Sequence, residues 1–513
     1  MNRRRAAALL AAVLLSGTAC SDDDSSIWAT TTAPSATSTL ATTTSAPTTT
    51  TQAGTTTTGT TQAGTTSTAA GDPSGLGDPY FPELGNPGYD VEHYLVELAV
   101  DPVANTVEGA VAATAASTAD LDTFHLDLLG LTVDSVTVDG AAAGFRREEG
   151  ELVIDPAGLL PAGEDFVVTV TYHGTPLNLT TLGFPIGWVQ AGDLTYVAAQ
   201  PDGARTWLPC NDHPADKAAF TFRITVPEGN VVAANGSLAA VQDGAGVSTF
   251  VWEMPEPMAT YLATVVVGPL TRVEWGTAAG VVLRDYLPAD LAADPPAPLT
   301  RVGEMMEFFT GFFGPYPFAE YGHAVVPGLP GALEDQTLCV FGREALETLF
   351  DAQPWTLGAE AVVAHELAHQ WFGDSVTPST WQDVWLNEGF ATFAQWLWVE
   401  HARGAEAYRQ EVAGSYAFVA EGPHPLPGDP GADGEAMFHY SVYLRGGLTL
   451  HALRVEVGDE TTWEILQAWA ERYAYGNAAT ADFVSLAEEL SGRDLGALFE
   501  AWLFDPSIPA LPG

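Results

Sequence analysis

Between residues 78 and 275, short apolar runs alternate with polar positions and are separated by Gly, Asp, Asn and Pro. The pattern is clearest at residues 94–100 (YLVELAV), 131–138 (LTVDSVTV) and 165–172 (DFVVTVTY). Alternation with a period of two, bounded by turn residues, is typical of strands that bury one face. We therefore expect residues 78–275 to form an antiparallel β-domain, either a sandwich or a saddle-shaped sheet.

The pattern changes in residues 276–513, where apolar positions recur with helical spacing. This part also contains a strand-like run at residues 323–326, followed by the Gly- and Pro-rich residues 327–331. We expect a mainly helical domain with a small sheet, and a multidomain α+β protein as a whole. The predicted helices span residues 298–313, 357–372, 386–403, 436–457, 461–475 and 481–490, and several end just before a glycine.

The N-terminal residues predict export and a tether. Arginines at positions 3–5 precede an apolar stretch that is too short to span a bilayer, as in a signal peptide. Residues 17–20 (GTAC) resemble a bacterial lipoprotein cleavage site. We therefore expect a signal peptide over residues 1–20 and a lipid anchor on Cys20 at the outer face of the bacterial membrane. An ordinary secretory leader is the alternative. Residues 21–77, rich in Thr, Ala and Ser, have too little apolar surface to fold and predict a disordered tether.

The net charge of the chain limits the classes of molecule that it can bind. Its 513 residues include 65 acidic and 18 basic ones, which gives a net charge of −47, and Lys217 is the only lysine. Nucleic-acid binding needs clustered Lys and Arg, so this composition excludes it. An acidic protein attracts cations such as a free peptide amine, although adaptation to salt explains the same composition.

Two cysteines remain beyond Cys20. Cys210 and Cys339 lie one in each predicted domain. An exported protein can oxidise such a pair to a disulfide, and two free buried thiols are the alternative.

Residues 365–369 (HELAH) form an H-E-x-x-H motif. On a helix, His365 and His369 share one face, so both imidazoles can bind one metal ion, and Glu366 can take the proton of a water at that metal. Residues 385–391 (WLNEGFA) follow on the next predicted helix and supply Glu388. Two histidines and a carboxylate are a common ligand set of catalytic zinc, although another divalent metal could occupy them.

The stretch from His365 to Phe393 (HELAHQWFGDSVTPSTWQDVWLNEGFATF) resembles the gluzincin aminopeptidases, the family of aminopeptidase N and leukotriene hydrolase. Residues 331–335 (GALED) resemble the G-A-M-E-N exopeptidase motif of that family, with Leu for Met and Asp for Asn. Residues 442–446 (VYLRG) resemble its V-Y-E-K-G segment. The β-domain ends with QPDGAR and PCNDHP, which also resemble the family. The motifs follow the order of the family over nearly all of residues 78–513.

The resemblance implies a role for each matching residue. It makes residues 276–513 a thermolysin-like catalytic domain with one zinc ion. Glu334 then binds the free α-amine of the substrate, assisted by Gln200, and the backbone at Gly331 and Ala332 pairs with the extended peptide. Tyr443 donates its hydroxyl to the oxyanion.

Asp383 precedes the third-ligand helix, and we expect it to orient a ligand imidazole. The implied function is hydrolysis of the N-terminal peptide bond of peptides with a free N-terminus. Lipid epoxide hydrolysis, endopeptidase activity and a surface-tethered binding protein with a structural metal remain as alternatives. The sequence leaves the oligomeric state open. The resemblance ends with the catalytic domain, so the helical C-terminal domain of larger members is not expected.

Overall fold

The computed structural model describes residues 75–181, 184–349, 358–431 and 434–513. The predicted signal peptide, the anchor at Cys20 and nearly all of the tether lie outside these residues. Within the described part of the chain, no helix combines the length and the apolar character needed to cross a bilayer.

An eight-stranded sheet forms the main layer of the N-terminal part. In β1 (Tyr89–Asp101) the buried positions change from odd to even numbers between Val91 and Tyr94, where a β-bulge shifts the register against β2 (Thr106–Ser117). The predicted antiparallel arrangement holds for neighbouring strands of this sheet except β1 and β12 (Lys217–Pro227), which run parallel. In spatial order the strands are β14 (Ser237–Asp243), β15 (Val247–Ala259), β12 (Lys217–Pro227), β1 (Tyr89–Asp101), β2 (Thr106–Ser117), β8 (Asp165–Gly174), β4 (Thr132–Val138) and β5 (Ala141–Ala142).

Two smaller sheets complete the β-domain. The five-stranded sheet has the order β13 (Val231–Ala234), β16 (Val265–Gly268), β11 (Leu194–Ala198), β10 (Phe184–Ala191) and β9 (Asn178–Thr181). The three-stranded sheet has the order β3 (Phe124–Asp127), β7 (Glu151–Asp155) and β6 (Gly144–Glu148). Short 3₁₀ turns at Ala204–Thr206 and Thr260–Leu262 connect strands of this domain.

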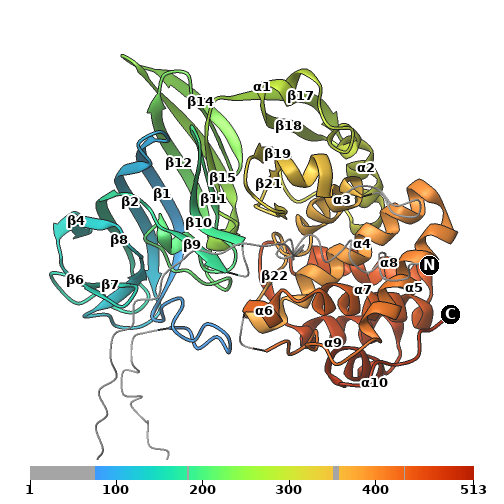
Figure 1. The fold of residues 1–513 in the computed structure, drawn as a ribbon. Helices are drawn as coiled ribbons and strands as arrows, with labels where there is room; N and C mark the ends of the chain where they lie inside the picture. The colour runs from blue at the N-terminus through green and yellow to red at the C-terminus, as the bar shows by residue number, and fades with distance from the viewer. Residues whose placement is uncertain (1–74, 182–183, 350–357, 432–433) are drawn as a thin grey trace, which may run out of the picture. The chain divides into compact units, whose positions relative to one another are not determined.

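A second five-stranded sheet belongs with the helical part, and Figure 1 shows α2 (Val302–Phe313) and α3 (Ala359–His369) beside it. The predicted strand at residues 323–326 is the C-terminal part of its central strand. The predicted domain boundary after residue 275 falls inside its first strand. Its order is β17 (Leu270–Ala278), β18 (Val281–Pro288), β19 (Glu320–Val326), β21 (Leu338–Gly342) and β20 (Ala332–Leu333). A two-stranded sheet pairs β22 (Thr377–Pro378) with β23 (Asn477–Ala478).

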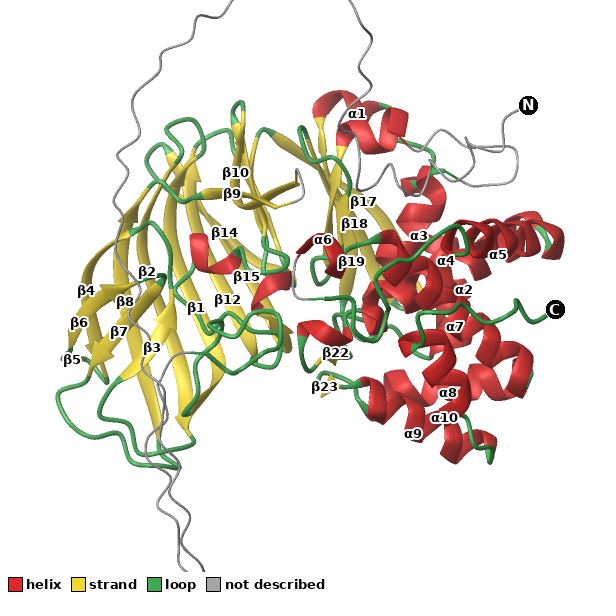
Figure 2. Cartoon of the chain, turned by 60° about the horizontal axis from the view of Figure 1, so that its bottom comes forward, coloured by secondary structure: helices red, strands yellow, loops and turns green. Residues whose placement is uncertain are grey.

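Helices are concentrated in the C-terminal part, as expected (Figure 2). The longer ones are α2 (Val302–Phe313), α3 (Ala359–His369), α4 (Trp385–Arg403), α5 (Ala405–Val419), α7 (Tyr440–Val457), α8 (Asp459–Arg472) and α9 (Thr480–Ser491). The short ones are α1 (Ala289–Ala293), α6 (Gly434–Met437) and α10 (Gly496–Phe499), with 3₁₀ turns at Leu299–Arg301 and Trp381–Asp383 and π turns at Ala345–Leu349 and Glu500–Phe504. Only α5 among the longer helices has no predicted counterpart; it carries Gly414 in its interior and buries few large apolar side chains.

Helices α4 and α7 cross in close contact. A Cβ atom added to Gly389 would lie 2.8 Å from the Cα atom of Gly446. A Cβ atom added to Gly446 would lie 2.8 Å from the Cα atom of Gly389. This crossing holds Glu388 on α4 near Tyr443 on α7.

Cys210 and Cys339 are both buried and are not joined by a disulfide bond. The disulfide alternative is therefore wrong for this structure.

Candidate active site

The structure brings the three predicted metal ligands together. One turn of α3 separates His365 from His369, and α4 presents Glu388 to both. The Nε2 atoms of the two histidines each lie 3.4 Å from Oε2 of Glu388. One ligand atom from each residue fits within 4.8 Å of the others. A zinc ion sits about 2 Å from its nitrogen and oxygen ligands, so these atoms surround a space of the right size.

Neighbouring groups orient the imidazoles. Nδ1 of His369 lies 3.1 Å from the carbonyl oxygen of Phe372, which leaves Nε2 free to face the metal. The expectation for Asp383 is wrong, because its carboxylate accepts bonds from the backbone amide and hydroxyl of Thr480, at 3.2 and 2.5 Å. It anchors the start of α9 instead of a ligand.

Burial and the charges of neighbouring ligands together set the pKa values of the ligands. It lowers the pKa of His365, which keeps the imidazole neutral as metal binding requires. Burial raises the pKa of Glu388, but the imidazoles of His369 and His365 outweigh it, and the net shift is downward. Glu388 is therefore an anion in this site.

Glu366 lies beside this ligand set and is 5% exposed. Burial raises the pKa of its carboxyl well above the usual range, and Glu334 and Glu388 add to this shift against the opposing effect of His369. A carboxyl group with a raised pKa can both accept and release a proton near neutral pH.

Glu334 and Gln200 meet although they come from different domains. Nε2 of Gln200 donates to Oε1 of Glu334 at 2.5 Å. Gln370 supports the same segment: its Nε2 donates to the Glu334 carbonyl at 3.1 Å, and its Oε1 accepts from the Thr337 amide at 2.8 Å. Sequence reasoning missed Gln370, although its place directly after His369 was a usable signal.

The predicted substrate strand is an edge strand. In β20, Ala332 and Leu333 pair with Phe341 and Val340 of β21, and no further described strand lies on the other side. The Gly331 carbonyl accepts from the amide of Gly342 at 2.8 Å. An open edge of this kind can pair with an extended peptide.

The Asp that replaces Asn in the exopeptidase motif is turned into the protein. Asp335 is 2% exposed, and its Oδ2 has no hydrogen-bond partner in the structure. Burial raises the pKa of Asp335 well above its usual range, and the nearby Glu334 adds to this. A protonated Asp335 adds no further negative charge beside Glu334.

Tyr443 faces the ligand set from α7. Its ring stacks on the His365 imidazole with centroids 6.1 Å apart. Burial raises the pKa of the phenol well above its usual range, with Glu388 and Glu334 in support. The hydroxyl therefore stays protonated and can donate.

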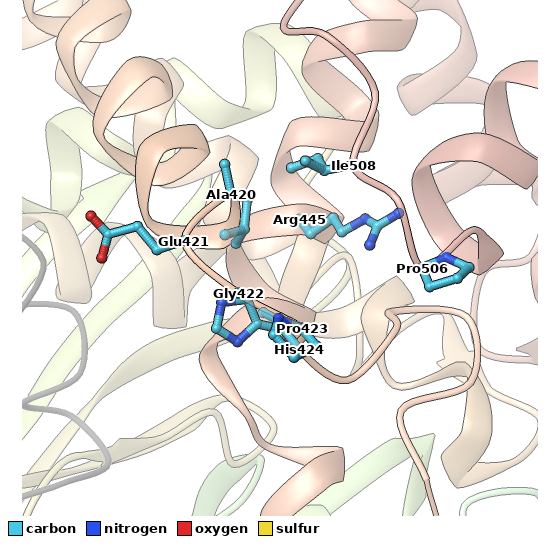
Figure 3. Close-up of a pocket in the computed structure, with 10 residues that line it drawn as sticks. Ala420, Glu421, Gly422, Pro423, His424, Arg445, Pro506 and Ile508 are labelled. Carbon is cyan, nitrogen blue, oxygen red and sulfur yellow. The ribbon is translucent and has the colours of Figure 1, made fainter.

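Arg445, two residues further on, has a different role. Its guanidinium donates to the backbone carbonyls of Trp502, Ala501 and Asp505, at 2.7, 3.0 and 2.5 Å. It lines a separate cavity of about 310 Å³, in which it extends toward Pro506 while Glu421 points away (Figure 3). The cation of this segment therefore holds the C-terminal residues.

Family models match both folded parts of the chain. Residues 90–262 match the peptidase M1 N-terminal domain, and residues 298–502 match the peptidase family M1 domain. Aminopeptidase M1-A of Oryza sativa subsp. japonica is 29% identical over 71% of this chain and 43% of that protein. Aminopeptidase N of Streptomyces lividans is 29% identical over 75% of this chain and 46% of that protein. The chain thus spans about half the length of the aminopeptidases it matches.

Solved structures agree with these matches. The M1 zinc metallopeptidase from Deinococcus radiodurans is 32% identical with a TM-score of 0.78, over 86% of this chain and 99% of that chain. A mutant of that metallopeptidase was solved with a Tyr-Ser-Ala substrate, and a two-domain M1 zinc metallopeptidase mutant was solved with L-arginine. The likeness therefore covers the β-domain and the helical domain together.

Proposed function

Because the chain belongs to peptidase family M1 and is similar to two-domain zinc metallopeptidases of that family, we propose that it is a zinc aminopeptidase. It hydrolyses the N-terminal peptide bond of peptides. The observation that carries this proposal is the pairing of Glu334 with Gln200 beside the ligand set and at the open edge of β20. A short peptide is a suitable substrate, since a relative was solved with a tripeptide.

His365, His369 and Glu388 would hold the zinc ion, which when bound would supply a Lewis acid to polarise the scissile carbonyl and lower the pKa of water. Glu366 takes the proton of the attacking water and passes it to the leaving amine. Its buried carboxyl, with a raised pKa, suits both steps. The hydroxyl of Tyr443 donates to the oxyanion that forms on the carbonyl.

The substrate is positioned by its free end. Glu334 receives the α-ammonium, and a charge-assisted bond between them fixes where the peptide begins. Gln200 holds the carboxylate from the β-domain. The backbone at Gly331 and Ala332 pairs with the extended peptide. These contacts favour an aminopeptidase over an endopeptidase, which has no use for an amine site.

We also propose that the chain is exported and anchored through Cys20. The arginines, the short apolar stretch and the GTAC sequence support this. A Cys20→Ala variant is expected to move from the membrane fraction to the soluble fraction. Retention of the variant in the membrane fraction would contradict the anchor.

The function is tested with fluorogenic aminoacyl reporters that carry a free or an acetylated amine, each with and without a chelator. We expect cleavage of the free-amine reporter alone, and loss of that cleavage with the chelator. Glu334→Gln should raise KM for the free-amine reporter. Equal cleavage of both reporters would indicate an endopeptidase. No cleavage by zinc-loaded protein would support the binding-protein alternative.

A further inference from the structure

The loop that follows the zinc helix is held from the β-domain. After α3 ends, residues 373–375 turn back, and the amide of Asp374 donates to the carbonyl of His369 at 3.0 Å. Three consecutive carbonyls of this loop, those of Gly373, Asp374 and Ser375, accept hydrogen bonds from β-domain side chains. Thr377 adds local bonds to the first two of them.

Lys217 supplies two of these bonds. It is the first residue of β12, and its Nζ atom lies 2.8 Å from the carbonyl oxygen of Asp374 and 3.0 Å from that of Ser375. No other side chain in the chain is a lysine. Its amine therefore ties the main sheet of the β-domain to the loop behind the metal ligands.

Tyr261 supplies the third bond and links the loop to α4. Its hydroxyl donates to the Gly373 carbonyl at 3.2 Å and accepts from Nδ2 of Asn387, also at 3.2 Å. Asn387 is fully buried and directly precedes Glu388. Phe372, whose carbonyl oxygen lies 3.1 Å from Nδ1 of His369, directly precedes this loop. Movement of the loop would therefore displace groups next to two of the three ligand residues, His369 and Glu388.

We propose that Lys217 and Tyr261 are positioning residues of the metal centre, through which the β-domain holds His369 and Glu388 in place. This inference rests on the proposed ligand set but not on the proposed substrate. Groups that hold metal ligands from behind commonly change metal affinity by about 10- to 100-fold when removed. Their effect should therefore appear in metal retention and in kcat, since the hydrogen bonds of Lys217 and Tyr261 go to the loop and to Asn387, whereas Gln200 bonds to Glu334.

The test measures the rate at which zinc-loaded, full-length protein loses zinc to a chromogenic chelator. Lys217→Met and Tyr261→Phe are expected to lose zinc at least about 10-fold faster than the unchanged chain. At saturating zinc, each should lower kcat for the free-amine reporter and leave KM within about two-fold. Lys217→Arg can still donate to two carbonyls and is expected to restore most of the zinc retention.

Matched controls separate positioning from general stability. Arg223→Met removes a cation from the same strand, where Arg223 pairs with Glu97 at 3.1 Å. Tyr172→Phe removes another buried hydroxyl, which donates to the Trp207 carbonyl at 2.8 Å inside the β-domain. Both controls are expected to lose zinc at the rate of the unchanged chain.

Unchanged zinc loss in Lys217→Met and Tyr261→Phe, or a rise in KM at constant kcat, would overturn the proposal. His369→Ala serves as the benchmark for the ligand set. Normal zinc retention by His369→Ala would show that the ligand assignment is wrong. If the reporters are not cleaved but the zinc-loss rates are as expected, the result would contradict the proposed substrate and not the positioning role.

Discussion

Two tyrosines on the same helix differ in what their hydroxyl groups contact. Tyr443 on α7 stacks on His365, and Glu388 is near enough to help raise the pKa of its burial-shifted phenol. The hydroxyl of Tyr440 lies 3.3 Å from Nδ1 of His424, outside the ligand set. The two residues therefore form a matched pair for testing the oxyanion donor.

Tyr443→Phe is expected to lower kcat by about 10²- to 10³-fold, because one preorganised donor to the oxyanion is lost. KM should change little, since the ground-state carbonyl needs this donor less than the transition state does. Steady-state kinetics with the free-amine reporter check this. Tyr440→Phe is the control, and an equal loss of kcat in both variants would contradict the assignment to Tyr443.

At this scale, local spacing predicts some contacts and misses others. The four-residue spacing of His365 and His369 is a property of one helix and could be read directly. The bond from Tyr261 to Gly373 joins residues 112 positions apart, and nothing in the local sequence signals it. Asp383 is the opposite case. Its position five residues before the third ligand suggested a contact with a ligand imidazole, but its carboxylate accepts a hydrogen bond from Thr480 instead.

At the scale of elements, the crossing of α4 and α7 depends on two glycines. Gly446→Ala places a Cβ atom 2.8 Å from the Cα atom of Gly389, so the helices must separate. We expect a loss of about 1–3 kcal/mol in the free energy of unfolding and a lower kcat, because Glu388 and Tyr443 move apart. Urea denaturation and reporter kinetics measure the two effects.

Gly414→Ala is the control for this prediction. Gly414 lies exposed on α5, and an added Cβ atom meets no atom within 4 Å. This substitution should stabilise the protein by about 0.5–1 kcal/mol, as alanine does in helices. A Gly446→Ala variant as stable and active as the unchanged chain would contradict the close crossing.

The helix missed by the sequence analysis carries a pH-sensitive group. Glu411 on α5 is 8% exposed, and its Oε1 has no hydrogen-bond partner in the structure. Burial raises the pKa of Glu411 to about 7. Between the unfolded pKa of about 4.3 and this value, the folded state holds the proton that the unfolded state has released. This group therefore lowers stability as the pH rises through that window.

Glu411→Gln removes the charge with little change of shape. We expect it to stabilise the protein above pH 7 by on the order of 2 kcal/mol, with the gain disappearing near pH 4. Urea denaturation at a series of pH values checks this. A constant difference between the variant and the unchanged chain at all pH values would contradict titration as the cause.

At the scale of the whole molecule, the spacing of apolar residues predicted a β-domain followed by a mainly helical domain. This spacing is informative because the burial of one face repeats along each strand and each helix. The pairing of β1 with β12 in parallel and the contacts between the domains depend on folded positions that periodicity does not encode. The amine site is an example, since Gln200 and Glu334 are 134 positions apart and come from different parts.

We expect removal of the metal to lower the free energy of unfolding of the protein. Glu334, Glu366 and Glu388 are buried close together and come from β20 and its flank, α3 and α4. Burial raises the pKa of Glu366 and of Glu334, and the neighbouring carboxylates add to both shifts, so a bound metal cation would relieve part of this cost of burial. Zinc that binds only the folded state adds about 4 kcal/mol when its concentration is 1,000 times its Kd. Chelator-treated protein is therefore expected to unfold at a lower urea concentration than zinc-loaded protein. The His365→Ala variant should show a much smaller zinc-dependent difference, because one ligand is gone. Equal unfolding of the unchanged chain with and without zinc would mean that His365, His369 and Glu388 do not hold the metal.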